Sequence, residues 1–128
     1  MSKRQLLIYI PPPGGGEAEK ALLQRIAARV PLQGATIFRS FDRFRSRLLR
    51  PSEVEDVVLI VPAGEEDLFR AIEVSDLLRD TAVVVALPAA LSHAADLAFR
   101  LRPRLVASLD DSREVIAAVV ENLAPQAA

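Results

Sequence analysis

Two apolar stretches, Asp56-Val57-Val58-Leu59-Ile60-Val61 and Ala82-Val83-Val84-Val85-Ala86-Leu87, decide the fold of this chain. Both are almost continuously apolar, which is typical of strands that are covered on both faces of a parallel sheet. Residues 65–79 between them carry apolar side chains at helical spacing. The sequence therefore predicts a strand–helix–strand unit whose two strands lie near the centre of a parallel sheet.

Three shorter stretches extend this pattern in both directions along the chain. They are Gln5–Ile10, Ala35–Arg39 and Arg104–Leu109, and each is followed by residues with helical spacing. The five expected helices cover about 17–30, 42–49, 65–79, 92–101 with Ser92 as N-cap, and 112–123. We expect a single α/β domain over residues 1–128 with a five-stranded parallel sheet and frayed ends at 1–4 and 125–128.

Composition narrows the classes of protein to which the chain can belong. Its 128 residues are 51% hydrophobic, which suits one domain with a core, and no apolar run approaches the roughly 18–20 residues of a membrane span. There is no cysteine, so disulfides, thiolate nucleophiles and sulfur metal ligands are excluded. The net charge of −1 argues against general nucleic-acid binding. We expect a cytoplasmic protein.

The carboxyl ends of the predicted strands lack reactive groups. In parallel sheets the chemistry is located at these ends, but here they are Ile10-Pro11-Pro12-Pro13, Val61-Pro62 and Leu87-Pro88. Helix dipoles and caps explain the nearby acids more simply than a metal site does; these acids are Glu65, Glu66, Asp67, Asp110 and Asp111. The single histidine, His93, has no partner motif, and we expect it at the surface. We therefore predict no enzymatic activity, no metal and no cofactor.

The alternation of strands and helices over nearly the whole chain resembles the receiver domain of bacterial response regulators. The most specific part is Asp56–Val61, the helix that ends with Asp76-Leu77-Leu78-Arg79, and Ala82–Leu87. The resemblance implies a flavodoxin-like (βα)5 fold, in which helices cover both faces of a sheet with strand order 2-1-3-4-5.

Receivers are known for a phosphorylation site at the strand ends, and this chain departs from it at each position. The family has an acidic pair after strand one, a phosphoacceptor aspartate ending strand three, a hydroxyl residue ending strand four and a lysine ending strand five. The corresponding residues here are Ile10 and Pro11, Val61, Leu87, and Leu109 or Asp110. The resemblance therefore implies a degenerate receiver that aspartyl phosphate does not switch.

Five arginines gather in the predicted second helix and the residues next to it. They are Arg39, Arg43, Arg45, Arg47 and Arg50, opposed by Asp42 alone. Two interpretations stay open: a contact face for a protein partner, or a solvated face that forms weak ion pairs with the acidic helix 65–79. No aromatic stacking platform accompanies them, so nucleic acid is not a favoured partner.

In receivers, helix four, strand five and helix five often form a dimer face. The matching region here has small and charged residues that form a candidate homodimer face, namely Ala94, Ala98, Arg102 and Arg113. We expect a phosphorylation-independent module that binds proteins, of unknown partner, in bacterial signalling or transcription control. The alternative is a small-ligand or nucleotide sensor that uses a pocket between loops 10–17 and 62–67.

Overall fold

The computed structural model describes residues 5–12, 16–31, 35–50 and 56–123. The ends that we expected to be frayed, 1–4 and 125–128, lie outside this part of the chain, as do residues 13–15 of the first predicted loop. In the described part, no helix has both the length and the apolar character that crossing a membrane requires.

A five-stranded, all-parallel sheet forms the centre of the domain, with the order β2-β1-β3-β4-β5. The flavodoxin-like α/β fold and its strand order are therefore confirmed. The strands are β1 (Leu6–Tyr9), β2 (Ala35–Phe38), β3 (Val57–Ile60), β4 (Ala82–Leu87) and β5 (Leu105–Ser108). The three inner strands are buried along their whole length, while the outer strands β2 and β5 are half-buried or exposed. This is the pattern that continuous apolar runs predict for central strands.

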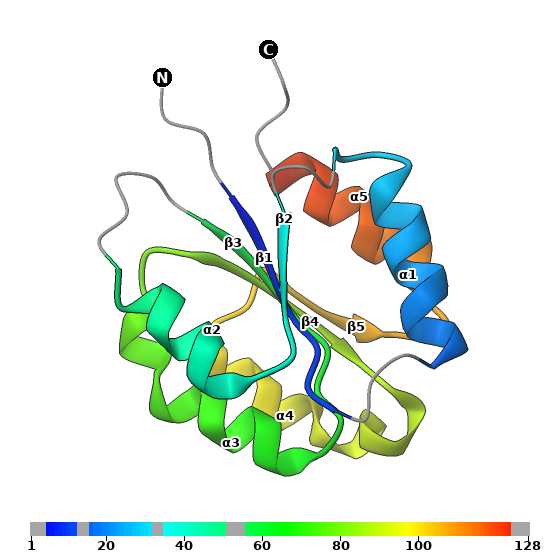
Figure 1. The fold of residues 1–128 in the computed structure, drawn as a ribbon. Helices are drawn as coiled ribbons and strands as arrows, with labels where there is room; N and C mark the ends of the chain where they lie inside the picture. Colours follow the sequence, from blue (N-terminus) through cyan, green and yellow to red (C-terminus); the bar gives the residue numbers. More distant parts are fainter. Residues whose placement is uncertain (1–4, 13–15, 32–34, 51–55, 124–128) are drawn as a thin grey trace.

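Helices cover both faces of the sheet (Figure 1). One layer contains α1 (Glu17–Ala27) and α5 (Arg113–Leu123), and the other contains α2 (Phe41–Leu48), α3 (Glu65–Glu73) and α4 (Ala95–Ala98). Because strand side chains alternate between faces, Ile8 and Leu59 pack under the first layer, whereas Leu7, Tyr9 and Val58 pack under the second. Each face thus has its own hydrophobic cluster.

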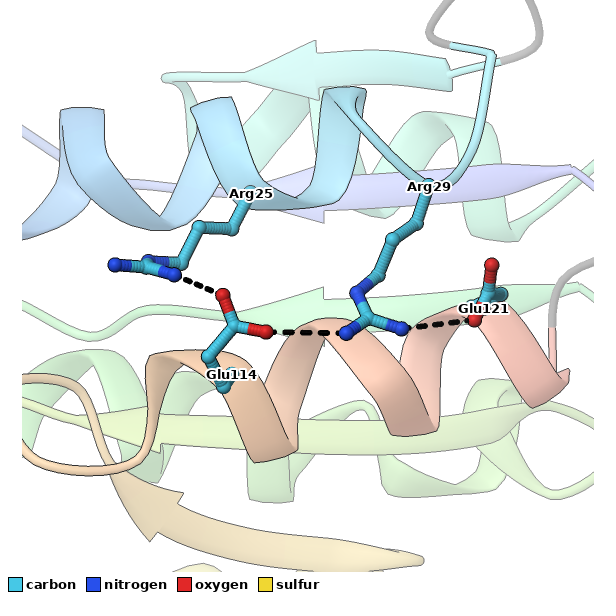
Figure 2. A network of polar contacts seen from close by, with 4 residues as sticks. All are labelled: Arg25, Arg29, Glu114 and Glu121. Atoms are coloured by element: carbon cyan, nitrogen blue, oxygen red, sulfur yellow. Dashed lines mark hydrogen bonds and ion pairs between the residues drawn. The ribbon is translucent and has the colours of Figure 1, made fainter.

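Ion pairs join the two helices of the α1/α5 layer (Figure 2). Arg29 places its two terminal nitrogens 3.0 Å from Glu114 Oε2 and 3.0 Å from Glu121 Oε1, and Arg25 also contacts Glu114. Hydrogen bonds from the two arginines lower the pKa of Glu114, and the bonds to both glutamates raise the pKa of Arg29. Since the groups are exposed, the network orients α1 on α5 more than it stabilises the fold.

The third helix is shorter than the predicted range 65–79. It ends at Glu73, because Val74 leaves the helical region with φ −106° and ψ 19°, and a 3₁₀ turn, η2 (Ser75–Leu78), follows. The tighter turn brings Leu78 into the core. Two large apolar residues of the helices, Phe69 of α3 and Val115 of α5, are exposed at the surface.

The predicted fourth helix is divided into three short pieces. These are η3 (Ala89–Ala94), α4 and η4 (Phe99–Leu101), so Ser92 lies inside a 3₁₀ turn and caps no helix. The buried residues Leu91, Ala94, Ala98 and Leu101 explain the division. Their spacing is three, four and three residues, and a spacing of three matches 3₁₀ rather than α geometry.

Candidate functional site

Apolar side chains fill the strand ends where receivers carry their phosphorylation site. Val61 is only 1% exposed, and its backbone N–H donates to the Tyr9 carbonyl at 2.9 Å. Leu87 and Leu109 are also buried, and the N–H of Leu109 donates to the Leu87 carbonyl at 2.8 Å. Ile10, which follows β1, is buried beside them. The side chains of these four residues carry no nucleophilic group.

The acids near this edge bond to local backbone groups. Asp67 Oδ2 accepts from the N–H groups of Ala63 and Gly64, at 2.9 and 3.0 Å, just before α3 begins. Asp110 Oδ2 accepts from the N–H of Ala89 at 3.3 Å. The Asp67 contacts confirm the capping interpretation at α3, whereas Asp110 bonds to the first residue of η3 and does not cap α5. In the described part of the chain, no three His, Cys, Asp or Glu side chains come together as metal ligands.

The single histidine is exposed, as expected from its sequence context. His93 Nε2 lies 2.6 Å from Glu65 Oε1, so the pair joins η3 to the first turn of α3. Both side chains are at least half exposed, and a pair of this kind contributes little to stability. Among the described residues, no hydroxyl or thiol group forms a hydrogen bond with either side chain of the pair.

A groove of about 1010 Å³, which we call the carboxyl-edge groove, lies where β1, β2 and β3 end. It coincides with the point at which the strand order reverses, the usual ligand position in open α/β sheets. Both predicted loops contribute to it, and the structure adds the loop after β2 and one side of α3. Its lining includes both signs of charge: Arg39, Asp42, Glu66, Asp67, Arg70 and Glu73, together with Tyr9.

Tyr9, Arg70 and Glu73 line this groove although the sequence did not predict them as site residues, and Tyr9 is the most buried of the three. Its ring stacks on Phe44 with centroids 4.9 Å apart and meets Phe41 edge-on at 5.9 Å. Burial raises the pKa of the Tyr9 hydroxyl to about 12, and the charge of Asp67 adds to this, while Arg70 opposes it through a hydrogen bond. The sequence did contain a signal for Tyr9 as a site residue, because a tyrosine at the last position of a strand can direct its hydroxyl toward the strand ends.

The predicted arginine cluster is divided between two places. Arg39 lines the carboxyl-edge groove, where its Nη1 donates to the Ile10 carbonyl at 3.4 Å. Arg43, Arg47 and Arg50 line a second groove of about 510 Å³ between β2 and α2, which we call the β2–α2 groove. Arg45 is exposed and lines neither groove. In the described residues, none of these arginines forms the expected ion pair with α3.

Arg47 differs from Arg43 and Arg50 because its side chain bonds to residues of other parts of the fold. One terminal nitrogen, Nη2, lies 2.8 Å from Gln5 Oε1 and 3.3 Å from Asp56 Oδ2, so the side chain connects α2 to the starts of β1 and β3. The Arg47 side chain is 17% exposed and that of Asp56 only 5%. Within the described part of the chain, Asp56 Oδ1 has no hydrogen-bond partner, and Arg47 is the cation that compensates the charge of this carboxylate there.

The predicted dimer face needs a correction at its two alanines. Ala94 and Ala98 are buried in the cluster under the second helical layer, where they pack inside the domain itself. Arg102 is exposed in the left-handed region with φ 53°, and Arg113 is partly buried. Large apolar side chains are exposed nearby instead: Phe99 is 58% and Val115 52% exposed.

No family model matches this chain, and comparisons with curated proteins and with solved structures also gave no match. The functional argument therefore rests on the geometry of the strand ends and the two grooves.

Proposed function

We propose that this domain is a non-catalytic, receiver-like regulatory module that binds another protein without being phosphorylated. The strand order 2-1-3-4-5 supports the receiver-like part of the proposal. The buried, apolar Val61 just after β3 supports the lack of phosphorylation, because phosphoryl transfer needs a nucleophile that can reach the donor. A bacterial signalling or transcription pathway is the setting that the resemblance implies.

A phosphoryl donor tests this proposal directly. We expect no change in intact mass when the protein is incubated with acetyl phosphate and Mg²⁺, while a receiver with an intact site gains one phosphoryl group in parallel. Stable addition of a phosphoryl group to this chain would contradict the proposal. Peptide mapping would then identify the acceptor residue.

We also propose that two copies pair through the face formed by α4, β5 and α5. The exposed Phe99 and Val115 lie in the elements that flank the outer strand β5, and exposed large apolar side chains are common at interfaces. Light scattering across protein concentrations should detect a dimer that Phe99→Glu or Val115→Glu dissociates. Leu49→Glu, at a residue exposed to a similar extent at the end of α2, serves as the control. A wild-type protein that stays monomeric would rule this dimer out.

A second candidate function is a small-ligand or nucleotide sensor. The carboxyl-edge groove favours it, because its volume of about 1010 Å³ is large enough for a nucleotide-sized ligand. A thermal-shift screen with nucleotides, with and without divalent cations, would give a raised Tm for a ligand that binds the folded state. Arg70→Ala should remove the effect if the groove is the site, and the absence of any shift would argue against a sensor.

A further inference from the structure

The strand β2 ends the sheet and leaves one of its sides unpaired in the described residues. It pairs with β1 alone. The Phe38 carbonyl accepts from the N–H of Ile10 at 2.9 Å, so the backbone groups of Phe38 face β1. Because successive residues of a strand present their backbone groups to opposite sides, the N–H and C=O of Ile37 point away from the sheet. An open edge of this kind can accept another strand.

The β2–α2 groove lies between this edge strand and α2, and its described lining has a net positive charge. The side chains of Thr36 and Phe38 reach it from the strand, and Arg43, Arg47 and Arg50 reach it from α2. Among the described residues of its lining, Asp42 is the only acid. Arg43 and Arg50 are exposed, and neither forms an ion pair with a described residue. Their positive charges are thus available to a bound group.

On its other face, β2 presents an apolar side chain. Ile37 is 43% exposed, and alternation places it on the α1 side of the sheet, opposite Thr36 and Phe38. A strand added beside β2 would therefore meet arginines with one set of alternate side chains and Ile37 with the other. Acidic residues suit the first set and apolar residues the second.

We infer that the β2 edge binds an extended acidic segment of a partner protein, whose acidic and apolar residues alternate, as an additional strand of the sheet. This inference rests on the proposed protein-binding function and names the chemistry of the partner. A second copy of this chain fits less well, because antiparallel pairing of two β2 strands would bring two arginine-rich α2 helices to the same face.

Synthetic peptides of about eight residues, the length of an ordinary strand, provide the test. A labelled peptide of alternating Glu and Val should bind the full chain, as followed by fluorescence anisotropy. A peptide with Lys in place of Glu, and one with the same Glu and Val residues grouped in two blocks, should not bind. Failure of the alternating acidic peptide to bind, or equal binding of the Lys peptide, would overturn the inference.

Backbone methylation separates strand addition from simple charge attraction. Only one edge of the peptide can face β2, and all Glu amides lie on one edge while all Val amides lie on the other. Methylation of one series of backbone nitrogens should therefore abolish binding, and methylation of the other series should preserve it. Equal behaviour of the two methylated peptides would overturn the inference.

Arginine variants locate the site on the protein. Arg43→Glu and Arg50→Glu should each weaken binding roughly three- to ten-fold at moderate ionic strength. Arg45→Glu makes the same charge change on the same helix but outside the groove, and it should alter binding less than about two-fold because salt screens distant charges. Equal losses in all three variants would contradict the site.

The outcomes also distinguish this inference from the proposed function. If the acidic peptide does not bind and the chain gains no phosphoryl group, the strand-addition inference fails while a phosphorylation-independent module stands. If acetyl phosphate modifies the chain, the proposed function fails whatever the peptides do. Arg47 is left unchanged throughout, because its contacts with Gln5 and Asp56 would confuse a binding defect with a folding defect.

Discussion

The arginines of α1 and those of α2 occupy opposite faces of the sheet and have different surroundings. Arg25 of α1 and Arg29 just after it border a hollow of about 490 Å³, but Glu114 and Glu121 of α5 already neutralise them. Arg43 and Arg50 border the β2–α2 groove without an ion pair to any described residue. The number of arginines therefore does not identify a binding face. An arginine that already pairs with an acid of the same domain has less charge to offer a partner than an unpaired one.

The two helical layers differ in regularity as well. The α1/α5 layer consists of two helices of 11 residues each, whereas the other layer has helices of 8, 9 and 4 residues with 3₁₀ turns among them. Both grooves described above border α2 in the irregular layer. The regular layer thus has no part in either groove, and both grooves lie on the side of the irregular layer.

The largest effect on stability should come from a substitution that removes the packing of α2 on the sheet. Phe44 is fully buried, stacks on Tyr9 and packs against Phe38 with ring centroids 5.7 Å apart. Phe44→Ala should lower the free energy of unfolding by about 3 to 5 kcal/mol, since the cavity cannot be filled by neighbours held in the sheet. Urea denaturation measures this change. A loss below about 1 kcal/mol would mean that α2 contributes little to the core.

The next effect separates structural arginines from available ones on the same helix. Arg47→Ala leaves the buried carboxylate of Asp56 without its partner, and we expect a loss of about 2 to 3 kcal/mol. The matched variant Arg43→Ala should change stability by less than about 0.5 kcal/mol. Denaturation of both variants under the same conditions gives the comparison, and similar losses in the two variants would erase the distinction drawn here.

A pH titration tests how strongly the irregular layer buries Tyr9 at the carboxyl-edge groove. The pKa of Tyr9 is raised from 10.0 to about 12, so the unfolded state loses this proton first as the pH increases. The stability linked to Tyr9 is therefore fully present below pH 10 and is lost as the pH rises toward 12, by on the order of 2 kcal/mol. Tyr9 is the only tyrosine in the chain, so near-ultraviolet absorbance follows it directly. Ionisation at pH 10 in the folded protein would contradict its buried environment.

The smallest effect should come from the neutralised arginines of the α1/α5 layer. Glu114 is exposed and its pKa is lowered, so the pairing is present at neutral pH and is lost as the pH falls through the lowered pKa. Glu114→Gln should reduce Tm slightly at neutral pH, less than Arg47→Ala does, and not at acidic pH. Added salt should diminish the difference. A large decrease in Tm would show that this network determines stability rather than orientation.

The central strands could be predicted because continuous apolar runs, such as Val57–Ile60, indicate strands that are buried on both faces. The strand order came from the resemblance to receivers, since five similar βα units do not by themselves define their neighbours. The fourth helix was misjudged because buried residues three apart, such as Leu91 and Ala94, fit both α and 3₁₀ turns. The grooves were beyond prediction in detail, because their residues come from strand ends and helix starts that only the packed sheet brings together.

The position of Arg47 has a consequence for when the β2–α2 surface exists. Its partners Gln5 and Asp56 lie 42 and 9 residues away in the chain and belong to the starts of two different strands. The contacts that hold the second helix through Arg47 therefore exist only when the starts of β1 and β3 lie side by side. A partner that binds this surface would therefore bind the folded domain and would not bind nascent chains or proteolytic fragments that lack these contacts.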